Sequence, residues 1–269
     1  MRILGVDFTS APRRAKPIVV AHAELAGGAL RLAALEPLYG FADFEALLAR
    51  PGPWVGGFDF PFGLPAELVR DLGWPARWPA LVEHCARLTR AELRRVLDAY
   101  RAARPPGRKY AHRATDGPAG SSSPMKLVNP PVALMFREGA PRLAAAGLRI
   151  PGLARGDPSR VALEAYPGLL ARAVTRASYK NDARARQTPE RLAARRRILA
   201  ALERGRHPLR TRVSFESASM RRRILKDGSG DCLDALLCAV QAAWGAARPN
   251  FGLPRRVLAC EGWIVSAAA

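Results

Sequence analysis

The chain has 269 residues, of which 49% are hydrophobic, and its formal net charge is +20. A chain of this length can bury a substantial core, and its composition predicts no disordered window. No apolar run approaches the roughly 18–20 residues that a transmembrane helix requires, and the N-terminus lacks the pattern of a secretory signal. We therefore expect a cytoplasmic protein without a membrane anchor.

The excess of 43 Lys and Arg over 23 Asp and Glu favours polyanionic partners, because neutralising phosphates releases condensed counterions. Nucleic acid, either DNA or RNA, is therefore the expected partner. Nearly all the basic residues are Arg, and the chain is rich in Ala, Gly and Pro, so codon bias in a GC-rich genome is an alternative explanation. The sequence does not determine the oligomeric state, and a homodimer is one arrangement that we consider.

The first 60 residues predict three consecutive strands, a helix and a fourth strand. Each strand is a short apolar run, and Gly27-Gly28 between the second and third is a strong hairpin signal. Apolar residues at helical spacing predict the helix. In chain order, these elements are strands at 2–8, 17–25 and 29–35, a helix at 41–50 and a strand at 54–60.

The remaining chain is mainly helical in its pattern, with no internal repeat. We interpret residues 66–151 as a largely helical insertion or cap within a single domain of residues 1–269. Later apolar and basic stretches predict two further helices and two further strands. The expected elements are helices at 66–72, 78–103 and 132–139, a strand at 161–166, helices at 189–204 and 230–244, and a last strand at 263–266.

Five acidic residues interrupt or border apolar segments. Asp7 and Asp59 lie near the ends of the first and fourth strands, and Glu164 lies inside a later one. An acid in a strand that is buried on both faces is costly to desolvate unless it is paired or liganded. Asp231 and Asp234 stand three residues apart at a helix start and therefore share one face.

Carboxylates gathered near strand ends and one helix start are suitable ligands for Mg²⁺ or Mn²⁺. Two such ions about 3.5–4 Å apart would activate a water and stabilise the leaving oxygen in phosphodiester hydrolysis. The scattered cysteines and histidines show no zinc-ligand spacing, which leaves oxygen ligands as the expected donors.

Each acid also has an ordinary structural explanation. Asp7 could bond to the turn that follows it at residues 9–10, as Asp residues often do. Asp231 could cap its helix, with Asp234 reaching back as in a capping box. Glu164 could pair with an arginine. The set of acids, more than any one member, supports a metal site.

Four motifs in order resemble the domain of unknown function 429 family. They are Gly-Val-Asp-Phe-Thr-Ser at 5–10, Gly-Phe-Asp-Phe-Pro-Phe-Gly-Leu-Pro at 57–65, Glu-Ala-Tyr-Pro at 164–167 and Asp-Cys-Leu-Asp-Ala-Leu at 231–236. The resemblance covers most of the chain, from the first strand to the last long helix. It implies a ribonuclease-H-like fold and an activity that is predicted to be nucleolytic.

The pattern Asp231-x-x-Asp234-Ala also resembles the final acidic helix motif of RuvC-like Holliday junction resolvases. This similarity implies that Asp7, Asp231 and Asp234 are metal ligands. Asp59 stands where the superfamily usually has its second acid, although it precedes Phe-Pro-Phe-Gly-Leu-Pro instead of a plain strand end. Glu164 falls on a later strand, so Asp59 and Glu164 compete for or share the second role.

Three basic residues are candidates for substrate binding. Lys126 and Lys180 attract attention because Lys is scarce in this Arg-dominated chain, although a solvated surface lysine is the ordinary explanation. The arginines between Arg184 and Arg223, with Arg222 among them, could follow a phosphate backbone. A solvated helix face rich in Arg is the alternative.

These observations favour an α/β ribonuclease-H-like domain: three antiparallel strands followed by parallel ones, flanked by helices, with a helical insertion. The expected function is a divalent-metal-dependent nuclease or phosphodiesterase, with Glu164 as a ligand or general base. The expected metal ligands, for Mg²⁺ or Mn²⁺, are Asp7, Asp59, Asp231 and Asp234. The alternatives are an actin/hexokinase-like phosphotransferase and a non-catalytic nucleic-acid-binding protein that retains the fold.

Overall fold

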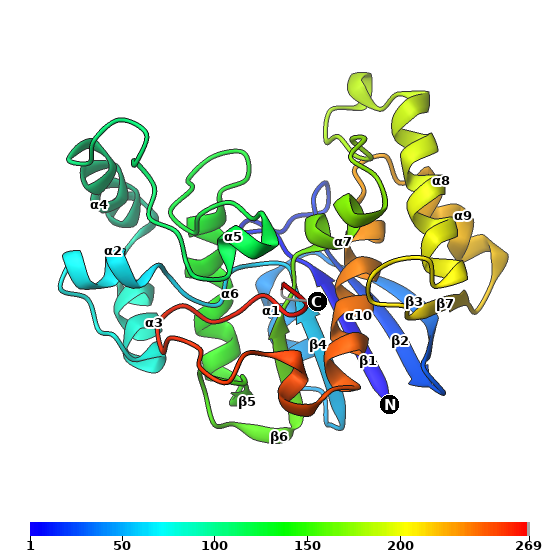
Figure 1. Ribbon diagram of the computed structural model, residues 1–269, viewed down its shortest axis with the longest axis horizontal. Coiled ribbons are helices and arrows are strands. Elements are labelled where there is room, and N and C mark those ends of the chain that lie inside the picture. The colour runs from blue at the N-terminus through cyan, green and yellow to red at the C-terminus, as the bar shows by residue number, and fades with distance from the viewer. Residues whose placement is uncertain (268–269) are drawn as a thin grey trace.

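A seven-stranded mixed sheet lies at the centre of the computed structural model, which describes residues 1–267 (Figure 1). The strand order is β5-β6-β4-β1-β2-β3-β7. Strand β2 is antiparallel to β1 and β3, and every other neighbouring pair is parallel. The strands are β1 (Arg2–Asp7), β2 (Ile18–Ala26), β3 (Ala29–Leu38), β4 (Trp54–Phe58), β5 (Leu148–Arg149), β6 (Asp157–Glu164) and β7 (Arg212–Phe215). This arrangement confirms the predicted fold class.

Helices cover both faces of the sheet and bury a separate core on each. One core joins the sheet to α1, α2, α3, α4 and α6, and the other joins it to α7, α8, α9 and α10. The helices are α1 (Phe41–Leu48), α2 (Ala66–Asp71), α3 (Trp78–Arg87), α4 (Arg90–Ala102), α5 (Asp116–Ala119), α6 (Val132–Ala145), α7 (Pro167–Val174), α8 (Pro189–Arg204), α9 (Ala218–Lys226) and α10 (Asp231–Ala246), with short 3-10 helices at Arg184–Arg186 and Pro249–Gly252. Helices α2 to α6 therefore all lie between β4 and β5 in the chain.

Strand β1 shows how the sheet directs side chains to the two cores. Leu4 and Val6 belong to the core under α1 and α6, whereas Ile3 belongs to the core under α10. Because successive side chains of a strand point to opposite faces, Gly5 and Asp7 share the face of Ile3. The last residue of β1 therefore presents its carboxylate to the α10 side of the sheet.

Helix α10 crosses directly over β1 and β4, in front of β1 in Figure 1, and is buried along nearly its whole length. Two glycines that pair across the ladder, Gly5 and Gly57, permit this close approach. A Cβ at Gly5 would lie 2.0 Å from the carbonyl oxygen of Ala235, and one at Gly57 would lie 2.4 Å from that of Cys238. The two glycines thus let the start of α10 lie over the ends of β1 and β4.

The single helix expected at residues 78–103 is wrong, because the structure has two helices there. Leu88 at the end of α3 is extended, and Thr89 begins α4. The Thr89 hydroxyl accepts a hydrogen bond from the N–H of Glu92, whose carboxylate accepts the N–H of Thr89 in return. This capping box satisfies free N–H groups at the start of α4 and marks the break.

Elements near the C-terminus also differ from expectation. Residues 263–266 form no strand, because Ile264 makes only an isolated bridge to Glu164. Strand β7, which pairs in parallel with β3 at the sheet edge, was not expected from its short Arg-Val-Ser-Phe sequence. Within residues 1–267, no helix is both long and apolar enough to cross a bilayer.

Candidate functional site

Asp7 and Asp59 stand at the ends of the two central parallel strands. Asp7 is the last residue of β1, and Asp59 directly follows Phe58 at the end of β4. The Asp59 N–H donates to the Val6 carbonyl over 2.9 Å and so extends the β1–β4 ladder. Neighbouring strands lie about 4.8 Å apart, so these two residues are adjacent at one edge of the sheet. Within the described chain, neither carboxylate accepts a hydrogen bond.

Asp231 and Asp234 lie in the first turn of α10, on the same side of the sheet. The helix begins after Gly230, whose φ of 83° is a left-handed conformation that glycine adopts readily. Asp227 binds the free N–H groups at this end: its carboxylate accepts from the N–H of Cys232 over 2.7 Å. Asp231 and Asp234 therefore do not cap the helix, and their carboxylates are free for other contacts.

The four carboxylates of Asp7, Asp59, Asp231 and Asp234, which we call the acidic site, act on one another electrostatically. Burial raises the pKa of Asp7 well above 3.8, and the charges of Asp234 and Asp231 raise it further. Burial also raises the pKa of Asp59 to about 7, with the charge of Asp234 as the next cause. The structure thus brings together four of the five acids that the sequence pointed to, in mutual repulsion.

Two lysines partly neutralise the acidic site. Lys180, whose side chain is 42% exposed, donates from its ammonium group to the fully buried carboxylate of Asp234. The Tyr179 hydroxyl donates to the other oxygen of Asp234 over 2.5 Å. Lys16, from the β1–β2 loop, lies 2.9 Å from Asp231 and 2.8 Å from the exposed Asp182. Burial works to lower the pKa values of both lysines, but the neighbouring carboxylates raise them overall.

The donor set of the acidic site suits a divalent cation such as Mg²⁺ or Mn²⁺, since all four ligands would be hard carboxylate oxygens. Two of the carboxylates have no donor in the described chain, which leaves their oxygens available. Among residues 1–267, however, no three acidic, histidine or cysteine side chains stand in a geometry that could hold one ion. Ammonium groups lie against Asp231 and Asp234 instead.

Within residues 1–267, Glu164 makes no hydrogen bond or ion pair with the acidic site, although its charge is one cause of the raised pKa of Asp59. It pairs with Arg113 through two contacts, of 2.7 and 2.9 Å, and accepts the N–H of Phe62 over 2.9 Å. Arg113 also binds Asp116 and the carbonyl of Glu261. Residue 164 pairs with Phe58 in the ladder, one position from Gly57 and Asp59, so its side chain leaves the sheet on the face opposite to them. We call Arg113, Asp116, Glu164 and Glu261 the Arg113 network.

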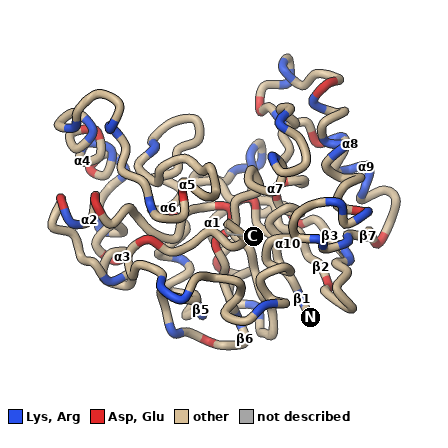
Figure 2. Tube along the Cα trace, in the orientation of Figure 1, with Lys and Arg blue, Asp and Glu red and all other residues tan. Residues whose placement is uncertain are grey.

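The three candidate substrate-binding residues lie in different places. Lys180 is part of the acidic site's surroundings, as described above. Arg222 is exposed on α9, where Lys and Arg gather along α8 and α9 in Figure 2. Lys126 lies in the segment before α6, and no hydrogen bond or ion pair within residues 1–267 connects its side chain to the acidic site.

Sequence reasoning missed several residues that shape this site. Lys16 and Tyr179 are distant in the sequence from the carboxylates that they contact, and no local sequence motif predicts either contact. The glycines were visible, because each lies two residues before an aspartate, in Gly-Val-Asp and Gly-Phe-Asp. A residue two positions earlier on a strand shares the face of the aspartate. A glycine at that position leaves room for a helix to pack closely on the same face, so this spacing was the available signal.

Comparison with known proteins identifies the family of the chain. A family model described as "Protein of unknown function (DUF429)" matches residues 5–252. Neither a curated protein nor a solved structure shows a significant match. The matched range contains all four aspartates of the acidic site, both glycines beneath α10 and the whole sheet except the first three residues of β1. On this match over most of its length, the chain belongs to the DUF429 family of proteins of unknown function.

Proposed function

We propose that the protein is a divalent-metal-dependent phosphodiesterase that acts on nucleic acid, with the acidic site as its active centre. One observation carries the proposal: Asp7 and Asp59 end adjacent parallel strands, make no hydrogen bond through their carboxylates within the described chain, and are held beside Asp234 despite mutual repulsion. Strongly perturbed carboxylates of this kind are typical of functional sites.

Although no three of their carboxylates now converge on one point among the described residues, the four aspartates would draw together to hold Mg²⁺ or Mn²⁺, since cation charge offsets the burial and repulsion that raise the pKa values of Asp7 and Asp59. When bound, the metal would lower the pKa of a coordinated water and offset negative charge on a phosphodiester. In the metal-free protein, Lys16 and Lys180 supply part of that positive charge. Once released from Asp231 and Asp234, their ammonium groups are available to neutralise a substrate phosphate.

Glu164 has no free acceptor position comparable to those of Asp7 and Asp59. Both of its oxygens bind the Arg113 guanidinium, and one also accepts the N–H of Phe62. We therefore assign Asp59, not Glu164, to the second metal-binding position of the acidic site. Glu164 instead connects β6 to Arg113 of the segment between β4 and β5.

Nucleic acid is the substrate class that the charge supports. The chain carries a formal net charge of +20, and the arginines of α8 and α9 lie on the same side of the sheet as the acidic site. The positive charge of the protein would attract a polyanion, while the local acidic centre would hold the metal that contacts it. A cytoplasmic location follows as part of this proposal.

The test is cleavage of fluorescein-labelled single-stranded, duplex and branched DNA and RNA by the full chain, with Mn²⁺ or Mg²⁺ and with EDTA. We expect Mn²⁺-dependent products from at least one substrate, and loss of cleavage in Asp7→Asn. The control is Asp98→Asn, because Asp98 is an exposed residue on α4 whose one ion pair within residues 1–267 is with Arg101.

Equal cleavage by Asp7→Asn and wild type would contradict the assignment of the acidic site. If no nucleic acid is cleaved with either metal but the protein binds one tightly, the non-catalytic binding alternative replaces the nuclease. Hydrolysis or transfer of the γ-phosphate of ATP would instead favour the phosphotransferase.

A further inference from the structure

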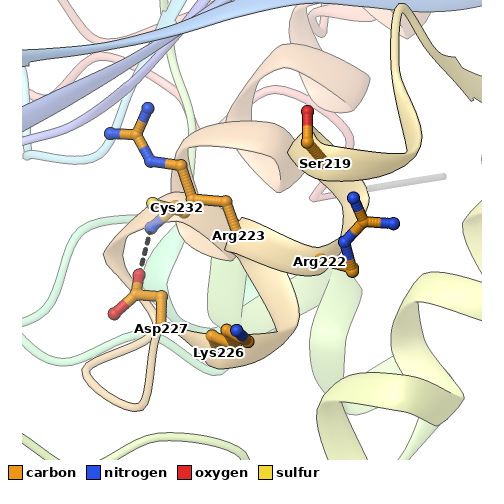
Figure 3. A pocket seen from close by; sticks show the side chains of 6 residues that line it. All are labelled: Ser219, Arg222, Arg223, Lys226, Asp227 and Cys232. Atoms are coloured by element: carbon orange, nitrogen blue, oxygen red, sulfur yellow. Dashed lines mark hydrogen bonds between the residues drawn. The ribbon is translucent and has the colours of Figure 1, made fainter.

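One face of α9 carries four polar residues that line a single pocket. Ser219, Arg222, Arg223 and Lys226 occupy positions i, i+3, i+4 and i+7 of the helix, so they form one stripe along it. We call this set the α9 stripe. The loop and first turn of α10 close the pocket with Asp227 and Cys232 (Figure 3). The pocket thus joins α9 to the helix that carries two aspartates of the acidic site.

The positive charge of this pocket has little compensation. Within residues 1–267, the side chains of Arg222 and Lys226 make no hydrogen bond or ion pair, and Arg223 donates only to the carbonyl of Leu35, over 3.0 Å. The Asp227 carboxylate is the one acidic group in the lining, and it is occupied by N–H groups at the start of α10. Three cations and one engaged carboxylate therefore line the pocket.

The pocket adjoins the acidic site through the first turn of α10. Cys232, which lines the pocket, directly follows Asp231, and consecutive Cα atoms are about 3.8 Å apart. Successive residues of a helix differ by about 100° in direction, so Cys232 faces α9 while Asp231 faces Lys16. The α9 stripe is therefore within reach of a strand of nucleic acid at the acidic site.

We propose that the α9 stripe is a phosphate-binding subsite that holds the backbone of the same nucleic-acid strand beside the acidic site. Two guanidinium groups and one ammonium supply only hydrogen-bond donors and positive charge toward the ligand, and the Ser219 hydroxyl can donate as well, which suits phosphodiester oxygens. The stripe is exposed along the helix, so a phosphate bound there leaves the rest of the strand free to continue. That the ligand is a nucleic-acid strand rests on the proposed function. Binding of the strand by the α9 stripe does not depend on whether the acidic site cleaves it.

The experiment measures binding of a fluorescein-labelled 20-nucleotide single strand by the full chain, using fluorescence anisotropy in EDTA at several salt concentrations. The test variant is Arg222→Gln with Lys226→Gln, because Arg223 also supports the Leu35 carbonyl and is better left in place. Two lost phosphate contacts should weaken binding about tenfold or more at 0.1 M salt, and should reduce the slope of log K against log salt by about 1.4, or about 0.7 for each contact.

The matched control is Arg255→Gln with Arg256→Gln, which removes the same charge from exposed residues outside the pocket. Thermal melting checks that both variants remain folded. Equal affinity and salt slope in the two double variants would overturn the subsite, as would failure of the wild type to bind the oligonucleotide. Absence of Mn²⁺-dependent cleavage, with binding still weakened only by the α9 variant, would reject the nuclease and leave the subsite standing.

Discussion

The protein contains two groups of buried carboxylates that differ in how their charge is balanced. In the Arg113 network, one guanidinium lies between Asp116 and Glu164, and the Glu261 carboxylate accepts N–H groups of Ala66 and Ala114 over 2.8 Å each. In the acidic site, four aspartates share two ammonium groups, and two of the four accept no hydrogen bond within the described chain.

On this difference we propose a structural role for the Arg113 network and a functional role for the acidic site. A fully hydrogen-bonded buried ion pair holds segments together: here Arg113 joins the helical segment after β4 to β6 and to the chain near Glu261. An undercompensated cluster costs stability in the free protein and is retained where a ligand completes it. The following predictions test that contrast.

The largest expected effect is on folding, from removal of the cation in the Arg113 network. Arg113→Met should lower the free energy of unfolding by about 3–5 kcal/mol, because it leaves Glu164 and Asp116 buried without a positively charged partner. Urea unfolding followed by circular dichroism measures the change. Arg94→Met, at an exposed position of α4, should change stability by no more than about 0.5 kcal/mol. Similar stability of the two variants would show that the network is not structural.

Next in size is the loss of metal binding from the acidic site. Asp7→Asn should weaken Mn²⁺ binding by at least about 100-fold. Mutation of a residue that only hydrogen-bonds to a metal ligand already lowers metal affinity by about 10–100-fold, and loss of the ligand itself should cost more. Isothermal titration calorimetry of the metal-free protein measures this affinity. Asp116→Asn, in the Arg113 network, should retain Mn²⁺ binding provided that it folds. Retained affinity in Asp7→Asn would place the metal elsewhere.

A moderate effect on stability should come from Asp59, with a defined pH dependence. Its pKa is raised from 3.8 to about 7, so between these pH values the folded protein holds a proton that the unfolded chain has lost. The free energy of unfolding therefore falls as pH rises from about 4 to about 7. An asparagine at this position cannot ionise, so Asp59→Asn removes this pH-dependent fall in the free energy of unfolding. The metal-free variant should therefore melt several degrees above wild type at pH 8, and near wild type at pH 4.

Melting curves in EDTA from pH 4 to pH 8 measure this difference, with Asp98→Asn as the exposed control. A melting temperature of Asp59→Asn that stays below wild type across this range would mean that the Asp59 carboxylate stabilises the fold. Saturating Mn²⁺ should reverse the order at pH 8, because wild type gains more from binding.

The smallest expected effect is on the competition between Lys180 and a metal for Asp234. Lys180→Met removes an ammonium group that contacts this carboxylate, so Mn²⁺ should bind about tenfold more tightly, as measured by calorimetry. Lys109→Met is the control, because the Lys109 ammonium donates, within the described residues, only to backbone carbonyls at the end of α4 and in the following turn. Weaker Mn²⁺ binding in Lys180→Met would mean that Lys180 supports the metal-bound state instead of competing with it.

Local patterns were sufficient for much of the fold. The three opening strands follow from apolar runs and turn signals, and the helix at residues 189–204 follows from a basic, Arg-rich stretch. The break at Thr89 and the short strand β7 did not follow. The first depends on a capping box inside a continuous helical pattern, and the second on pairing with β3, which is distant in the sequence.

The sequence by itself also selected the aspartates of the acidic site, because an acid at the end of an apolar strand or at the start of an apolar helix is rare without a reason. It could not separate Glu164 from them. That separation depends on ladder register: residue 164 pairs with Phe58, not with Gly57, and a shift of one residue exchanges the faces of a strand.

Only the tertiary structure decided which charges surround each carboxylate. Lys16 and Lys180 reach the acidic site across 215 and 54 residues of sequence, and Arg113 reaches Glu164 across 51. Ion pairs at such separations are set by how loops pack on the sheet, and local sequence carries no record of them. Composition and strand pattern determined where burial of a carboxylate would be costly. Packing determined which carboxylates are balanced by a guanidinium and which remain without a hydrogen-bond donor in the described chain.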